Sequence, residues 1–190
     1  MDMKEILYDQ YRFTGKWSNH VSFSLLITNR AFRRLYYYRI LSKKNSVLFN
    51  VFRMLNYLLS KKMSLELPHT VNLGKGTLFL HPYSITFMSR CVIGNNFTIC
   101  KGATIGYSQT GNEGYPIIGD NVYVGINSTV VGGIHIGNDV MIAANTFVNF
   151  DVPDGALVLG SPGVIHKKEK ASLPYIANSI TNIKTQETNI

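Results

Sequence analysis

Four histidines lie in the part of the chain with the most regular pattern: His69, His81, His135 and His166. Neutral imidazole is well suited to accept a proton near pH 7, so these residues are the first candidates for general-base chemistry. His81 is distinctive because the proline that follows it restricts the local backbone. The alternative is that His81 is a corner residue that only hydrogen-bonds a backbone carbonyl.

Two cysteines and one loop serine offer a competing, covalent chemistry. Cys91 and Cys100 give neither a disulfide framework nor a metal-ligand spacing, so no metal is expected. Neither thiol has a base beside it in the sequence, and Ser108 is no better placed. A covalent route is therefore the weaker hypothesis, although a base could still approach a thiol in space.

An aliphatic or aromatic residue returns every sixth position, which predicts the scaffold that holds these side chains. The positions are Leu67, Leu73, Phe79, Ile85, then Ile93, Ile99, Ile105, and then Ile118, Val124, Val130, Ile136, Ile142 and Val148. Neither a helix nor an alternating strand selects for a period of six. A coil with three flat faces does, with one inward residue per face and a small neighbour at each corner. We therefore expect a mainly β fold of stacked parallel coils, in which His135 faces solvent.

Three irregularities divide the chain. Seven extra residues between Ile105 and Ile118 predict a protruding loop over 107–116, a common place for binding residues. The stretch 160–163 turns the chain away from the coils. We expect a helical segment over 1–65, the β-helix over 66–166, and a tail over 167–190 whose last part, 178–190, is mobile.

Helical periodicity and positive charge mark the N-terminal segment. Residues 1–30 suggest short helices, residues 31–44 one helix, and residues 46–61 another. Residues 1–65 contain twelve Lys and Arg against three Asp and Glu, whereas residues 66–190 contain seven against eight. The segment is expected to cap the open end of the β-helix. A second, compatible expectation is that it rests peripherally on anionic lipid. No nucleic-acid motif accompanies the charge, and no signal peptide or membrane span is expected.

The repeat resembles that of the hexapeptide-repeat acyltransferases over about residues 66–166. It is most similar to their serine acetyltransferase branch, including shorter enzymes of bacterial polysaccharide synthesis. The resemblance implies a left-handed parallel β-helix, whereas the general crossover rule would predict the opposite hand. It also implies a homotrimer with acetyl-CoA as co-substrate.

The resemblance assigns roles to particular residues. It implies that His81 is the general base and that Glu66, fifteen residues earlier, orients it. It also implies that the pantetheine arm of acetyl-CoA lies against small residues between subunits, with a lysine near the CoA phosphates. The matching cofactor-binding positions are Gly106, Gly125, Ala143, Ala144, Ser161 and Pro162. The basic residue expected two positions after that proline is Val164 here, so Lys167 or Lys168 is expected to meet the CoA phosphates instead.

Two departures from the resembled enzymes bear on the acceptor. The acidic residue expected before the catalytic histidine is Leu80 here, and the Arg-His-Pro expected at the end of the loop is Gly114-Tyr115-Pro116. Both positions have lost the charge that a zwitterionic amino acid needs. Tyr107, Asn112 and Tyr115 could instead bind a neutral sugar.

The first functional hypothesis is therefore an acetyl-CoA-dependent O-acetyltransferase that modifies a sugar hydroxyl of a bacterial surface polysaccharide or its precursor. The alternative is L-serine O-acetylation, and a third hypothesis is an inactive trimeric β-helix that serves as a scaffold. A cytoplasmic location is expected, at the inner face of the membrane if residues 1–65 bind lipid.

Overall fold

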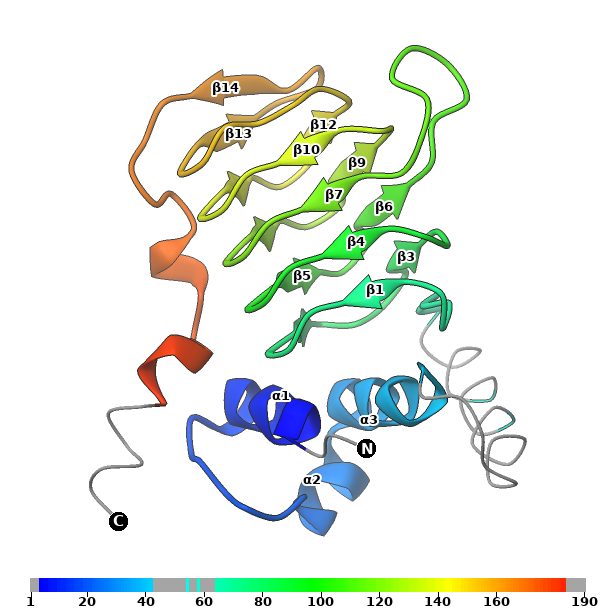
Figure 1. Cartoon of the computed structure of the whole chain (residues 1–190), viewed down its shortest axis with the longest axis vertical. Helices are drawn as coiled ribbons and strands as arrows, with labels where there is room; N and C mark the ends of the chain where they lie inside the picture. Colours follow the sequence, from blue (N-terminus) through cyan, green and yellow to red (C-terminus); the bar gives the residue numbers. More distant parts are fainter. Residues whose placement is uncertain (1–3, 43–53, 55–57, 59–63, 184–190) are drawn as a thin grey trace.

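Three sheets form the walls of a left-handed β-helix that stands on a layer of helices (Figure 1). This computed structural model describes residues 4–42, 54, 58 and 64–183. Face I contains β1 (Asn72–Leu73), β4 (Val92–Ile93), β7 (Ile117–Ile118) and β10 (His135–Ile136). Face II contains β2 (Leu78–Leu80), β5 (Thr98–Cys100), β8 (Tyr123–Val124), β11 (Met141–Ile142), β13 (Leu157–Leu159) and β14 (Val164–His166). Face III contains β3 (Thr86–Phe87), β6 (Thr104–Gly106), β9 (Thr129–Val131) and β12 (Phe147–Val148).

The residues at the six-residue period form the core, as the sequence predicts. All thirteen inward positions are buried, from Leu67 to Val148, and they belong to one continuous cluster. Consecutive coils pair in parallel, for example Tyr123 with Met141 on face II. His135 is exposed, which confirms the prediction that it faces solvent.

The sequence predicts that one small residue makes each corner, whereas in the structure stacking and turning fall to two different residues. Between faces I and II, Gly94 is needed for close stacking, because a Cβ there would lie 2.5 Å from the Gly119 carbonyl oxygen. The turn itself is made two residues later by Asn96, whose φ of 55° falls in the left-handed region that asparagine tolerates. Asn96 donates to Asn121, which in turn donates to Asp139, so the corner residues form a ladder of hydrogen bonds.

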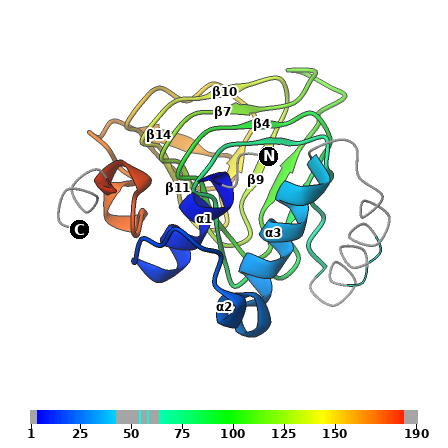
Figure 2. The same ribbon diagram turned by 60° about the horizontal axis from the view of Figure 1, so that its bottom comes forward.

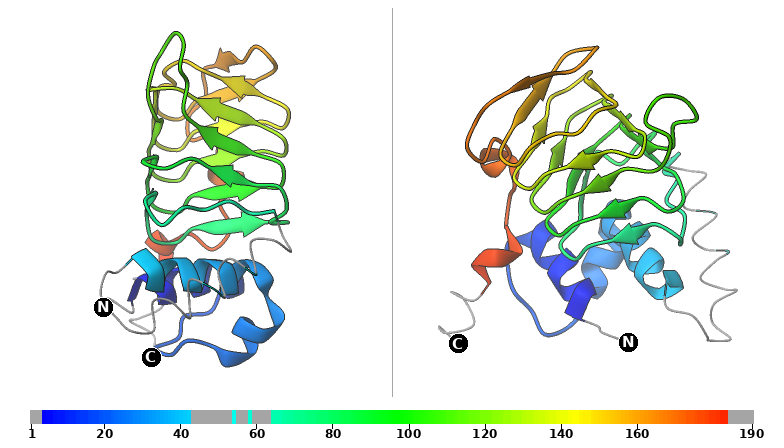
Figure 3. Two further views of the ribbon diagram at one scale, coloured as in Figure 1. Left: turned by 90° about the vertical axis from the view of Figure 1, so that its right-hand side faces the viewer. Right: turned by 45° about the horizontal axis from the view of Figure 1, so that its top comes forward.

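The helices cover the open end of the first coil (Figures 2 and 3). They are α1 (Lys4–Thr14), α2 (Phe23–Thr28) and α3 (Arg30–Ser42). The predicted helix over 31–44 is confirmed by α3, and the short helices expected within 1–30 by α1 and α2. Apart from Met54 and Leu58, the helix predicted over 46–61 lies outside the described residues. Within the described residues, no helix is both long and apolar enough to cross a membrane.

Buried side chains of α1 and α3 bind the backbone of the first coil, which has no preceding coil to pair with. Arg34 donates to the Leu67 carbonyl, Tyr38 to Val71, Arg39 to Leu73 and Gly74, and Arg12 to Gly76. Asp9 accepts from the Thr77 amide at 3.0 Å and from Arg39 Nε at 2.8 Å. Burial raises the pKa of Asp9 while Arg39 opposes that rise. These contacts support the capping interpretation. They also explain Arg12, Arg34 and Arg39 without any need for bound lipid.

The C-terminal segment corrects one prediction. Residues 178–183 are docked rather than mobile, because the tail runs back along the coils from the last strands to the helical layer (Figure 1). Its two short helices are η1 (Leu173–Tyr175) and η2 (Ile180–Asn182). Ile180 N donates to Asn96 at 2.9 Å, and Asn178 donates to the Arg12 carbonyl at 3.1 Å. Residues 184–190 lie outside the described part.

The cap predicts a large effect for Arg39→Met. The substitution leaves the Asp9 carboxyl buried without its ion-pair partner, which typically costs about 3–5 kcal/mol. We expect a correspondingly lower urea midpoint at fixed protein concentration. The control is Lys16→Met, an exposed position with an expected change within about 0.5 kcal/mol. Equal stability of Arg39→Met and the wild type would show that the cap does not hold the first coil.

Candidate active site

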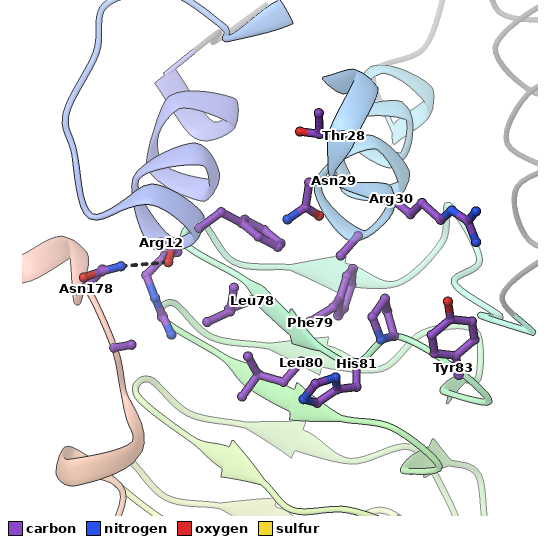
Figure 4. A pocket seen from close by; sticks show the side chains of 14 residues that line it. Arg12, Thr28, Asn29, Arg30, Leu78, Phe79, Leu80, His81, Tyr83 and Asn178 are labelled. Atoms are coloured by element: carbon purple, nitrogen blue, oxygen red, sulfur yellow. Dashed lines mark hydrogen bonds between the residues drawn. The ribbon is translucent and has the colours of Figure 1, made fainter. Parts of the chain in front are cut away.

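A cavity of about 580 Å³ lies where the helical cap meets the first coil, and it contains His81 (Figure 4). This volume falls within the usual range for small-molecule sites. Three segments form its walls: the cap, the stretch 78–83 with β2, and the tail. The lining residues are Arg12, Phe13, Thr28, Asn29, Arg30, Ala31, Leu78, Phe79, Leu80, His81, Pro82, Tyr83, Ala177 and Asn178.

His81 follows β2 directly, at the corner between faces II and III. Its φ is 51°, and its carbonyl accepts from the Tyr83 amide at 2.7 Å, so the backbone turns sharply here. The side chain is exposed and makes no hydrogen bond within the described residues. The imidazole is therefore available to a substrate, in contrast to the alternative of a corner histidine bound to a backbone carbonyl.

Glu66 lies on face III and does not contact His81 in this chain. It pairs in parallel with Thr86, and its carbonyl accepts from the Phe87 amide at 2.8 Å. Its side chain is exposed, and no ion pair between Glu66 and His81 is found among the described residues. The structure therefore does not itself bring these two side chains together.

Most of the predicted donor-binding residues share one edge with His81. Gly125 follows β8, Ala143 and Ala144 follow β11, and Ser161 follows β13, so all continue strands of face II as His81 does. From β2 to β13 there are four strand steps, or roughly 19 Å at the usual strand spacing. The edge is thus long enough for an extended ligand to run along it toward His81.

The remaining donor-binding candidates are less clearly grouped. Pro162 and Lys167 are exposed near the last coil, whereas Gly106 is buried on face III. A Cβ on Gly125 would lie 2.6 Å from the Ala144 amide nitrogen, so coil stacking alone already requires glycine there. Small size at Gly125 is therefore not specific to a ligand.

The predicted acceptor-binding residues form a separate group on the loop 107–116. Tyr107 donates to Glu113 at 2.7 Å, and this hydrogen bond raises the pKa of Tyr107. Asn112 donates to the Asn149 carbonyl at 2.9 Å, and the Tyr107 and Tyr115 rings lie 4.9 Å apart. The loop protrudes between β6 and β7, as predicted, but none of its residues lines the cavity with His81 (Figure 1).

Several residues of the cavity were missed by the sequence argument. Thr28, Asn29 and Arg30 come from the junction of α2 and α3, and Arg12 comes from α1. Nothing in the repeat pattern connects the cap to His81, and isolated arginines among aromatic residues resemble ordinary surface charge. Only the docking of the cap on the first coil places them there.

The cysteines are poorly suited to a covalent mechanism. Cys91 and Cys100 are both buried. Burial raises the pKa of Cys91 to about 11 and also raises that of Cys100, which donates to the Tyr123 hydroxyl. Both thiols therefore stay protonated at neutral pH, and neither lines the cavity.

The fold and site resemble those of hexapeptide-repeat β-helix proteins, and comparison with known proteins agrees. Residues 115–149 match the family described as bacterial transferase hexapeptide (six repeats). Serine acetyltransferase from Staphylococcus epidermidis is 36% identical over 120 residues, which is 62% of this chain and 55% of that protein. The Staphylococcus aureus enzyme is 36% identical over 108 residues, 55% of this chain and 50% of its own length. The chain thus spans about half the length of these curated relatives.

Solved structures extend the likeness to the cap. The serine acetyltransferase of Neisseria gonorrhoeae matches 89% of this chain and 69% of its own, at 25% identity and a TM-score of 0.73. The same enzyme in complex with serine matches 85% of this chain and 67% of its own, at 29% identity and a TM-score of 0.67. The chain resembles the serine acetyltransferase-like branch of the hexapeptide-repeat acyltransferases.

These matches correct the first functional hypothesis. The relatives are named serine acetyltransferases, and this contradicts polysaccharide O-acetylation as the first hypothesis. The hypothesis rested on the missing charges at Leu80 and Gly114. The positive charge missing at Gly114 has a counterpart in Arg12 and Arg30 of the cap, which line the cavity from positions far away in the sequence, whereas the acidic residue missing at Leu80 has none among the lining residues.

Burial of the thiols gives a prediction for thiol labelling. At pH 8 the folded protein should react with a maleimide much more slowly than the same protein unfolded in guanidinium, which should label both cysteines. A thiol that reacts equally fast in the folded and unfolded protein would restore the covalent hypothesis.

Proposed function

We propose that this protein is an acetyl-CoA-dependent O-acetyltransferase whose acceptor is L-serine. The observation that carries the proposal is the exposed imidazole of His81, which makes no hydrogen bond in the described part of the chain and lies in a cavity at the edge of face II. The likeness to serine acetyltransferases supplies the acceptor. A cytoplasmic location is part of the proposal, because it is where acetyl-CoA is available.

The chemistry assigned to His81 is general-base catalysis of direct acyl transfer. Its neutral imidazole takes the proton of the acceptor hydroxyl as the oxygen attacks the thioester carbonyl. The C–O bond forms, the C–S bond then breaks, and the CoA thiolate leaves with the proton returned by the imidazolium. Glu66 is proposed as a positioning residue for His81, which requires a rearrangement from the exposed position that it has in this chain.

The exposed edge of face II fits the proposed donor. After β8 and β11 this edge carries small side chains at Gly125, Ala143 and Ala144, so a narrow chain could approach the backbone closely there. Ser161 and Pro162 lie at the far end of this edge, and Lys167 is exposed beyond them. Lys167 is proposed to meet the phosphates of CoA.

The proposed assembly is a homotrimer with sites between subunits. Within one chain the loop 107–116 does not reach the cavity of His81. A neighbouring copy could bring Tyr107, Asn112 and Tyr115 to that cavity, and its face could close the donor edge. The active site would then be complete only in the assembly.

The first experiment replaces His81 and measures release of CoA from acetyl-CoA with L-serine. We expect His81→Ala to lower turnover by about 10²–10⁴-fold, the usual contribution of a general base. His81→Asn should behave alike, and it tolerates the positive φ at this corner. Glu66→Gln should lower turnover less, because the imidazole remains.

The control for this experiment is His135→Ala, which removes an exposed histidine of face I outside the cavity. Its turnover should equal that of the wild type. Near-normal turnover of His81→Ala would refute the base assignment. A wild type that consumes no acetyl-CoA with any hydroxyl acceptor would favour the scaffold hypothesis instead.

The second experiment tests the shared site. Sedimentation equilibrium should give the mass of three 21.3 kDa chains, about 64 kDa. Mixed trimers of His81→Ala and a loop variant, Tyr115→Ala, should regain activity that neither variant has alone. A monomer with full activity would contradict the proposal.

A further inference from the structure

The cavity of His81 has a distinctive charge: basic residues line it, and no carboxylate does. Arg12, Arg30 and His81 are the ionisable bases among its lining residues, and Tyr83 is the only other titratable group. The cavity therefore favours an anionic group in its ligand. Phe13 and Leu78 are among the apolar residues that complete the lining.

Arg12 and Arg30 differ in how much of their hydrogen-bonding capacity is already used. Arg12 is buried, and its terminal nitrogens bind the Gly76 carbonyl at 2.9 Å and the Thr98 hydroxyl at 2.7 Å. Burial lowers the pKa of Arg12 to about 10, and its Nε has no hydrogen-bond partner. Arg12 therefore contributes positive potential, while most of its donors hold the first and second coils.

Arg30 is exposed and makes no hydrogen bond or ion pair within the described residues. It is the first residue of α3, where a cation opposes the helix dipole, so helix stability does not explain an arginine there. Figure 4 shows Arg30 extending from the start of α3, with His81 lower down beside Leu80 on the strand side of the pocket. The guanidinium points away from His81 in this view, so contact with an acceptor beside His81 requires the Arg30 side chain to turn inward.

We propose that Arg30 binds the carboxylate of the amino-acid acceptor and so determines specificity for that class of substrate. The guanidinium forms two parallel hydrogen bonds with a carboxylate, which orients the acceptor as well as attracting it. The hydroxyl of the acceptor then points toward His81. This role rests on the proposed function, and it supplies from the cap the charge that is missing at Gly114.

The test compares L-serine with L-serinamide, which keeps the hydroxyl and the ammonium group but has no carboxylate. For Arg30→Gln, the KM for L-serine should rise by about 10-fold or more, as expected for loss of a charge-assisted hydrogen bond. The KM values for serinamide and acetyl-CoA should not change. Arg30→Lys should restore part of the affinity, because it keeps the charge without the bidentate geometry.

The matched control is Arg90→Gln, an exposed arginine between β3 and β4 that does not line the cavity. It should leave every KM unchanged. Equal increases for serine and serinamide in Arg30→Gln would reduce Arg30 to a structural role, and an increase for acetyl-CoA alone would assign it to the CoA phosphates. Either result overturns the proposal, as does an unchanged KM for serine.

Calorimetric binding of L-serine separates this proposal from the proposed function, because it needs no turnover. If the wild type binds serine more tightly than Arg30→Gln but transfers no acetyl group, the proposed function is contradicted and the role of Arg30 is supported. Equal binding by the wild type and Arg30→Gln would contradict the role of Arg30 even if acetyl transfer occurs.

Discussion

The backbone ladder between parallel coils is the constraint on which this structure depends. Every coil uses the hydrogen-bonding groups of the coil beside it, so the first coil must find other partners for carbonyls that would otherwise be buried and unpaired. Arg34, Tyr38, Arg39 and Arg12 supply these partners from α1 and α3. A buried carboxylate, Asp9, binds a first-coil amide and compensates the charge of Arg39. The helical segment therefore covers the first coil with polar contacts as well as apolar ones.

This way of closing the β-helix also builds the candidate site. Docking of the cap over the first coil encloses the corner where His81 emerges from β2, and the C-terminal tail completes the wall with Asn178. Arg12 takes part in both tasks, since it binds the coil and lines the cavity. The contacts that hold the cap and the lining of the candidate site are thus coupled at this end of the molecule. The other end of face II, near Ser161, carries only the proposed contacts to the donor.

The sequence predicts the coils well because their signal is local and repeated. One inward residue per face, such as Ile99 or Val130, is required by burial alone. The cap contacts could not be predicted in this way, because the arginine partners are backbone carbonyls more than thirty residues away and leave no trace in side-chain types. The same limit bears on the wrong acceptor: the loss of positive charge at Gly114 was judged from the loop sequence alone, whereas Arg30 lines the cavity from the helical layer.

Direct transfer of an acetyl group to serine, with His81 as base, is the central claim. Mass spectrometry of a reaction containing the wild-type protein, acetyl-CoA and L-serine tests it in one measurement. The account predicts O-acetyl-L-serine and CoA in equal amounts and a protein of unchanged mass. CoA release without acetylserine, or a protein that gains an acetyl group on Cys91 or Cys100, would contradict it.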